Sequence, residues 1–89
     1  MRISEMVGQV AAWHLITFPD AGVPVIAAKL LEESFELQDA GSKVELADEL
    51  ADVVLVAFAL AGRSAINLEQ ALEEKFQLNQ ERAHQGRWN

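Results

Sequence analysis

A run of twelve residues, 50–61, carries only one polar side chain, that of Asp52. A helix that is apolar on all sides is expected to be buried. An isolated carboxylate in such a setting is costly, so it either takes up a proton or lies against a cation. No Lys or Arg lies within one helical turn of Asp52 to pair with it. The run therefore predicts a buried helix whose single acid is protonated or faces a bound cation.

The length and composition of the chain limit the class of protein to which it can belong. The chain has 89 residues, which predicts a single domain over 1–89, with 85–89 as a candidate flexible tail. The absence of Cys excludes disulfide bonds and thiol chemistry. Hydrophobic residues make up 51% of this short chain, and this predicts an apolar surface reserved for another copy of it.

Neither a secretory signal nor a membrane span is expected. The first ten residues lack a basic region followed by a sustained apolar one. The longest apolar run, 53–61, is far shorter than the ~20 residues that cross a bilayer. A formal net charge of −7 argues against binding to a nucleic-acid polymer. We therefore expect a cytoplasmic protein with neither a nucleic-acid polymer nor a membrane as partner.

Turn-forming residues divide the chain into four helical segments. The only two prolines, Pro19 and Pro24, bracket one turn. We expect helices over about residues 3–18, 24–41, 42–61 and 67–84. The short connections predict an all-α fold that resembles a four-helix bundle, in which consecutive helices are antiparallel neighbours.

Capping residues support these boundaries. Ser42 is followed after three residues by Glu45, and Asn67 by Gln70, which is the spacing of a capping box. Gly62 is expected to end the third helix, because glycine is common just past a helix C-terminus.

Negative charge is concentrated in residues 32–52. This segment holds eight of the 14 acidic residues and one of the seven basic ones, so it accounts for the whole net charge of −7. At about 100° per residue the acids form one narrow stripe on each of two helices. The stripes consist of Glu32, Glu33 and Glu36, and of Glu45, Asp48, Glu49 and Asp52. Such a stripe usually faces solvent, and this alternative applies best to the second helix taken alone.

Acids from the two stripes can also converge on a cation. If the second and third helices are antiparallel neighbours, Glu33 and Glu36 can approach Glu49 and Asp52. Four carboxylates suit a hard divalent ion such as Mg²⁺ or Mn²⁺. With only two histidines, far apart in the sequence, a typical zinc site is not expected.

The fourth helix carries a stripe that begins apolar and becomes cationic, and it consists of Leu68, Leu72, Lys75, Asn79 and Arg82. Lys and Arg bind phosphate oxygens, and the Asn amide both donates and accepts hydrogen bonds. The alternative is that the cations only favour a helix C-terminus or pair with neighbouring glutamates.

These patterns together resemble the MazG-like all-α nucleoside triphosphate pyrophosphohydrolases. The family's E-E-x-x-E and E-x-x-D motifs occur as Glu32-Glu33-Ser34-Phe35-Glu36 and Glu49-Leu50-Ala51-Asp52. Its closing K-x-x-x-N-x-x-R pattern occurs as Lys75, Asn79 and Arg82, with Trp88 beyond. The likeness covers about residues 25–88. It departs from the family at Phe35, where many members have a small residue.

The resemblance implies a helical fold that assembles as a homodimer or homotetramer. It also implies a Mg²⁺ requirement, with Mn²⁺ as a substitute. The implied reaction converts a nucleoside triphosphate, either a dNTP or an NTP, into the monophosphate and pyrophosphate.

The same resemblance assigns roles residue by residue. The implied metal ligands are Glu33, Glu36, Glu49 and Asp52. Glu32 and Glu33 are the implied catalytic acids, with Glu32 holding a second metal ion or the attacking water. The implied phosphate-binding residues are Lys75, Asn79 and Arg82.

The first helix matches the family least, and in the family this helix binds the base. Trp13, His14 and Phe18 are weaker candidates for base binding, because such rings stack on a base or hydrogen-bond to its edge. The alternative, that His14 and Phe18 are core or subunit-contact residues, is favoured by the usual burial tendencies.

Two rival functions stay open at this point. Phosphoribosyl-ATP pyrophosphohydrolase shares the acid pattern, although the fourth helix fits it less well. The other rival is a non-catalytic helical interaction module, in which the acids face solvent and the apolar third helix is a dimer seam.

Overall fold

The structure is a computed structural model of the chain, and it describes residues 2–86. This range is all-α, as predicted, and contains four helices and no strand: α1 (Ile3–Thr17), α2 (Val23–Gln38), α3 (Lys43–Arg63) and α4 (Leu68–His84). None of these helices is both long and apolar enough to cross a membrane. Trp88 and the end of the predicted tail lie outside the described residues.

Side-chain caps fix the starts of α3 and α4. Ser42 Oγ accepts a hydrogen bond from the Glu45 amide at 3.1 Å, and Asn67 Oδ1 accepts one from the Gln70 amide at 3.1 Å. Glu45 Oε2 in turn accepts a bond from the Gly41 amide at 2.9 Å. Each cap satisfies a backbone N–H that has no partner within its helix. Both predicted caps are therefore confirmed.

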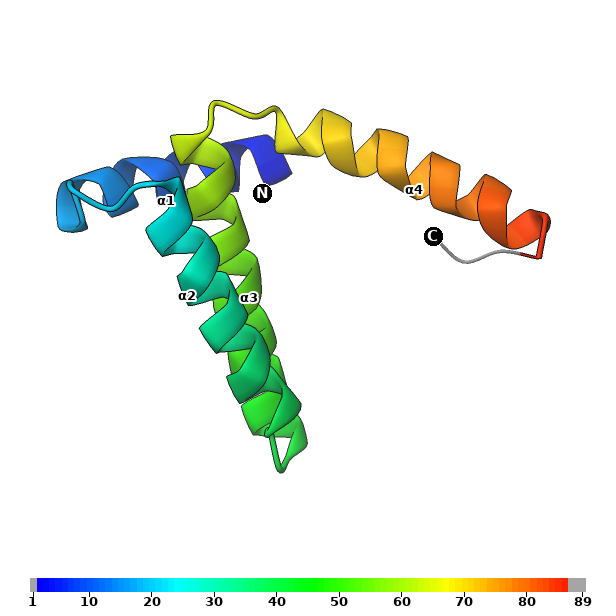
Figure 1. Ribbon diagram of the computed structural model, residues 1–89, viewed down its shortest axis with the longest axis horizontal. Helices are drawn as coiled ribbons and strands as arrows, with labels where there is room; N and C mark the ends of the chain where they lie inside the picture. The colour runs from blue at the N-terminus through cyan, green and yellow to red at the C-terminus, as the bar shows by residue number, and fades with distance from the viewer. Residues whose placement is uncertain (1, 87–89) are drawn as a thin grey trace.

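α2 and α3 form an antiparallel hairpin, and α1 crosses the C-terminal half of α3 (Figure 1). The crossing is closest at Gly62, where an added Cβ would collide with the Cβ of Ala11. The prediction that Gly62 ends the third helix is wrong, because α3 continues through it to Arg63. The glycine instead lets two helices approach without a side chain between them.

α4 projects away from the α2–α3 hairpin and packs against α1 near its start (Figure 1). There Arg2 Nη2 lies 3.3 Å from Glu69 Oε2. The chain turns at Ala65, whose φ of 54° is in the left-handed region, and the Ile66 amide donates to Ala61 O at 3.0 Å. The expectation of antiparallel neighbours therefore holds for α2 and α3 but not for α3 and α4.

Burial of the apolar stretch 50–61 is only partial in a single chain. Ala59 and Ala61 are 2% and 4% exposed, whereas Leu50, Val54 and Leu55 are 50%, 40% and 42% exposed. The prediction that this stretch is buried on all sides is wrong at the level of one chain. The reason is that α1 and α2 cover only part of the circumference of α3.

Candidate functional site

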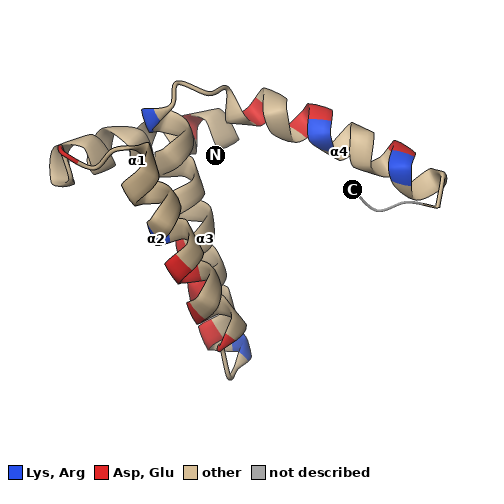
Figure 2. Ribbon diagram, viewed as in Figure 1, with Lys and Arg blue, Asp and Glu red and all other residues tan. Residues whose placement is uncertain are grey.

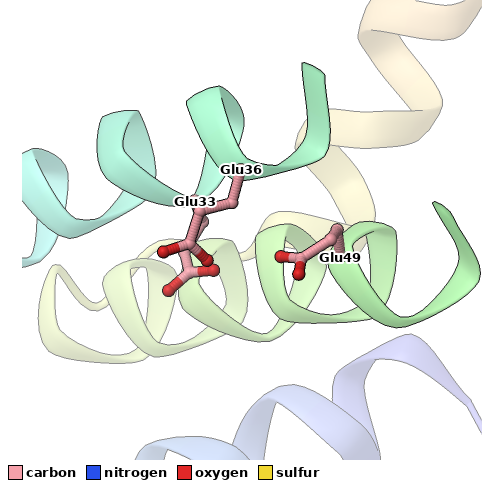
Figure 3. A group of neighbouring side chains, drawn as sticks. All are labelled: Glu33, Glu36 and Glu49. Atoms are coloured by element: carbon pink, nitrogen blue, oxygen red, sulfur yellow. The ribbon is translucent and has the colours of Figure 1, made fainter. Parts of the chain in front are cut away.

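Acidic residues of α2 and α3 gather in the half of the hairpin farther from α1, which is its acidic half (Figure 2). Glu33, Glu36 and Glu49 each contribute a carboxylate oxygen to a group whose members lie within 4.8 Å of one another (Figure 3). A second group with the same spacing contains Asp48, Glu49 and Asp52. Glu49 belongs to both groups, so it joins the two acidic stripes into one site.

This site has the chemistry that a divalent ion requires. Glu33 is only 6% exposed, and Oε2 of Glu33 and Oε2 of Glu49 are buried without a hydrogen-bond partner. Burying a carboxylate oxygen without a partner is costly. Mg²⁺ and Mn²⁺ prefer such hard oxygen ligands. The residues present therefore fit the predicted ion.

Lys29 is a member of the site that the sequence analysis missed. Its Nζ lies 3.0 Å from Glu33 Oε1 and 3.6 Å from Glu32 Oε2. The hydrogen bond from Lys29 holds the pKa of Glu33 below its usual value, although burial of the carboxylate acts in the opposite direction. The same hydrogen bond raises the pKa of Lys29. The i,i+3 and i,i+4 spacing from Lys29 to these acids is the signal in the sequence.

The pKa of Glu36 is shifted in the opposite direction from that of Glu33. It shares a hydrogen bond with Glu33 and feels the negative charges of Glu33 and Glu49, and these effects raise its pKa above the usual value. Without a cation, Glu36 thus binds a proton more readily than Glu33 does. Like charges held this close favour either a shared proton or a bound metal ion.

The remaining two predicted acids occupy different positions. Asp52 is half-buried and has two carboxylate neighbours, Asp48 and Glu49, so it is not the isolated buried acid expected from the sequence. Glu32 lies outside both carboxylate groups, and 61% of its side chain is exposed. Its predicted catalytic role stays a prediction.

A groove of about 710 Å³ runs between α1 and the α2–α3 hairpin and ends at the acids. Its polar end contains Lys29, Glu33 and Asp52. The three rings predicted to bind a base, those of Trp13, His14 and Phe18, line the same groove. Their centroids are 5.9 Å apart for Trp13 and Phe18 and 5.1 Å apart for His14 and Phe18. An aromatic wall and a carboxylate cluster therefore share one groove.

Arg63 is a second residue that the sequence analysis missed. It ends α3 and donates hydrogen bonds to the end of α1, including one to Phe18 O at 2.6 Å and one to His14 Nδ1 at 3.1 Å. Burial and the nearby positive charge of Arg63 lower the pKa of His14. The main contacts of Arg63 are to backbone carbonyl groups, which leave no pattern in the sequence.

The predicted phosphate-binding residues are not brought to the acids within one chain. Lys75, Asn79 and Arg82 lie on α4, which points away from the acidic half of the hairpin (Figure 2). None of them lines the groove. Asn79 and Arg82 are half-buried, whereas Lys75 is exposed.

Known proteins share both the sequence and the architecture of this chain. The family described as phosphoribosyl-ATP pyrophosphohydrolase matches residues 15–78. A solved structure of a cyanophage S-2L MazG-like pyrophosphohydrolase, bound to dGDP and three catalytic Mn²⁺ ions per active site, is 32% identical to the chain. The similarity covers 92% of this chain and 81% of that one, with a TM-score of 0.76. No curated protein matched the chain.

The family match spans most of the chain, including both acid motifs. The structural match spans nearly all of it, with the same arrangement of helices. Both matching groups act on pyrophosphate bonds, which favours the enzymatic prediction over that of a non-catalytic module. The chain therefore belongs to the MazG-like all-α nucleotide pyrophosphohydrolases.

Proposed function

We propose that this chain is a Mg²⁺-dependent nucleoside triphosphate pyrophosphohydrolase that releases the nucleoside monophosphate and pyrophosphate. The observation that carries the proposal is the groove, which joins an aromatic wall to the converging carboxylates of Glu33, Glu36 and Glu49. A nucleotide has the same two parts, an apolar base and an anionic phosphate chain. The phosphates need a cation to lie beside carboxylates.

The acids are proposed as ligands according to their positions. Glu33, Glu36, Glu49 and Asp52 would hold Mg²⁺, or Mn²⁺ in its place, as the MazG-like neighbour holds Mn²⁺. A divalent ion there would neutralise charge that develops on the phosphates during hydrolysis. Glu32, which is exposed at the edge of this set, is proposed to orient the attacking water or to help hold a second ion.

Trp13, His14 and Phe18 are proposed to bind the base. Trp13 is 58% exposed and Phe18 is 49% exposed, so both rings are accessible from the groove. Stacking on exposed aromatic rings is favourable for any base and does not by itself select one. The dGDP bound by the MazG-like neighbour supports a nucleotide in this groove.

The fourth helix is proposed to act in a second copy of the chain. α4 leaves its own acids, and Leu72 and Phe76 on it are 44% and 66% exposed. Lys75 and Arg82 on the same helix complement the acidic hairpin of another chain. A homodimer or homotetramer would cover these apolar side chains and bring Lys75, Asn79 and Arg82 to the phosphates. The cytoplasmic location stays a prediction from the sequence.

A panel of nucleotides tests the proposed reaction. The purified chain is incubated with each dNTP and NTP and either Mg²⁺ or Mn²⁺, and pyrophosphate and orthophosphate are measured separately. We expect pyrophosphate and a nucleoside monophosphate in equal amounts. Release of orthophosphate, or no turnover with any nucleotide, would contradict the proposal.

Phosphoribosyl-ATP is the second candidate substrate, because the family of that name matches residues 15–78. That match ends before Asn79 and Arg82, which are part of the pattern that favours the nucleoside triphosphate reading. Including phosphoribosyl-ATP in the panel decides between the two. A kcat/KM for it that exceeds that of every nucleoside triphosphate would make it the substrate.

A further inference from the structure

Arg63 joins the end of α3 to the end of α1 through one guanidinium group. Its Nη2 lies 2.6 Å from Phe18 O, 3.3 Å from His14 O and 3.1 Å from His14 Nδ1, and its Nη1 lies 3.3 Å from Pro19 O. The three oxygens belong to the C-terminal turn of α1 and the residues after it. Two of them also accept a backbone bond, His14 O from the Phe18 amide at 2.8 Å and Phe18 O from the Ala21 amide at 3.2 Å. Arg63 makes no ion pair with a carboxylate in the part of the chain described. Its positive charge therefore interacts with the carbonyl groups at the C-terminal end of α1.

The contact with His14 fixes the protonation of the ring. A guanidinium group only donates hydrogen bonds, so His14 Nδ1 has to accept. An accepting Nδ1 carries no proton, which places the ring proton of neutral imidazole on Nε2. Protonation of Nδ1 would set two donors against each other at 3.1 Å. The lowered pKa of His14 is in accord with this neutral form.

The other edge of the ring is the one available to a ligand. His14 lines the groove, whereas Arg63 does not, so the Nδ1 edge faces away from the groove. The opposite edge carries Nε2. Among residues 2–86, His14 Nε2 has no hydrogen-bond partner. The groove thus has a free N–H donor beside the rings of Trp13 and Phe18.

We propose that Arg63 is a positioning residue that holds His14 as the Nε2–H tautomer, so that the aromatic end of the groove donates a hydrogen bond to an acceptor on the base edge. The inference rests on the proposed function, because it takes the groove to be the base site. A base that presents a ring nitrogen or a carbonyl oxygen to His14 Nε2 is therefore favoured. A base that presents an amino or C–H group there is disfavoured.

The tautomer is measured directly by ¹⁵N NMR of the imidazole groups in the full chain, without metal or nucleotide, at about pH 7.5. This pH is about one unit above the usual histidine pKa. We expect His14 to have a protonated Nε2 and an unprotonated Nδ1. The exposed His84 on α4 supplies an internal reference. In Arg63→Met we expect a mixture of tautomers at His14, whereas in Arg2→Met, which removes the same charge from the surface, we expect no change. A His14 that carries its proton on Nδ1 in the unmodified chain would overturn the proposal.

Kinetics test whether Arg63 acts through His14. With the nucleotide that is hydrolysed best, His14→Phe and Arg63→Met should each raise KM about 3- to 10-fold, the range for one lost hydrogen bond, with kcat nearly unchanged. The double variant should be no worse than either single variant. Multiplicative effects on KM, or an unchanged KM in His14→Phe, would overturn the proposal. If Arg63→Met does not fold, the tautomer of His14 in the unmodified chain and the KM of His14→Phe still decide the proposal.

The two proposals fail in distinguishable ways. If no nucleotide is hydrolysed but His14 is the Nε2–H tautomer only while Arg63 is present, the proposed reaction is wrong, whereas the effect of Arg63 on the tautomer of His14 stands. If hydrolysis is normal and the tautomer is the other one, only the positioning role is wrong.

Discussion

Lys29 Nζ lies 3.0 Å from Glu33 Oε1, so the ammonium group of Lys29 pairs with one oxygen of the buried Glu33 carboxylate. A divalent ion bound by Glu33 would compete with this ammonium group for the same charge. We therefore predict that Lys29→Met lowers the melting temperature without metal and enlarges the increase in melting temperature that Mg²⁺ or Mn²⁺ produces.

The matched control for Lys29 is Lys43→Met, which removes the same charge at the far end of the hairpin, where Lys43 begins α3. Its metal-induced change in melting temperature should equal that of the unmodified chain. Thermal unfolding at a fixed metal concentration measures both. An equal metal effect in Lys29→Met and the unmodified chain would mean that Lys29 and the ion do not compete.

Glu49→Gln should abolish both metal stabilisation and turnover, because Glu49 belongs to both carboxylate groups. We expect pyrophosphate release to fall by more than about 100-fold, the upper range for losing a residue that only supports a metal ligand. Asp39→Asn, which neutralises an exposed acid at the C-terminus of α2, should leave turnover unchanged. Normal turnover in Glu49→Gln would remove the carboxylate cluster from the reaction.

Mixing two inactive variants tests whether α4 acts in a second copy. Glu49→Gln lacks a proposed metal ligand, and Arg82→Met lacks a proposed phosphate ligand. In a mixed dimer, one site combines the intact acids of one chain with the intact α4 of the other. Random pairing after co-refolding should then restore about one quarter of the unmodified activity, given an isologous dimer. No restoration would place both residues in the same site of one chain.

The contact of Gly62 with Ala11 makes a prediction about stability. Gly62→Ala places a methyl group against Ala11 and should lower the free energy of unfolding by about 1–3 kcal/mol. Gly8→Ala on α1 meets nothing within 4 Å and should raise it by about 0.5–1 kcal/mol, since alanine favours a helix. Urea unfolding of both variants measures these differences. A stable Gly62→Ala would mean that α1 shifts to make room without loss.

Stability should fall as the pH drops through about 6.5 toward the lower pKa of His14 in the folded chain. Burial and the charge of Arg63 lower the pKa of His14 in the folded chain below the value of about 6.5 for an unfolded one. In the window between these two pKa values the unfolded chain binds more protons, so the free energy of unfolding decreases as the pH falls. The decrease ends once the pH is below the folded pKa.

The pH effect is isolated by comparison with His14→Phe. Lys29 and Glu33 line the same groove as His14, and their titration is common to both proteins. The free energy of unfolding of His14→Phe should therefore depend less on pH in this window. Identical pH profiles would mean that His14 titrates alike in the folded and unfolded chain.

Local interactions explain what could be predicted from the sequence. The caps at Ser42 and Asn67 involve residues three apart, so their spacing alone identifies them. The meeting of Glu33, Glu36 and Glu49 follows from two stripes on neighbouring antiparallel helices. Both inferences need only the helical period and one short turn.

Other features depend on backbone geometry that the sequence does not reveal. The direction of α4 follows from the positive φ of Ala65. A glycine at this position would have indicated a positive φ in the sequence, whereas an alanine does not. Arg63 binds carbonyl oxygens, which every residue has. The incomplete burial of α3 likewise depends on how far α1 and α2 extend around it, which hydrophobicity alone does not determine.

The absence of a side chain at Gly62 also bears on how the groove could change its width. α1, which carries Trp13 and His14, rests directly on α3 at this residue. A single extra carbon atom there would act as a wedge and tilt α1 outward, moving both rings away from the hairpin. One substitution at this helix crossing would thus change the width of the groove without altering any residue that lines it.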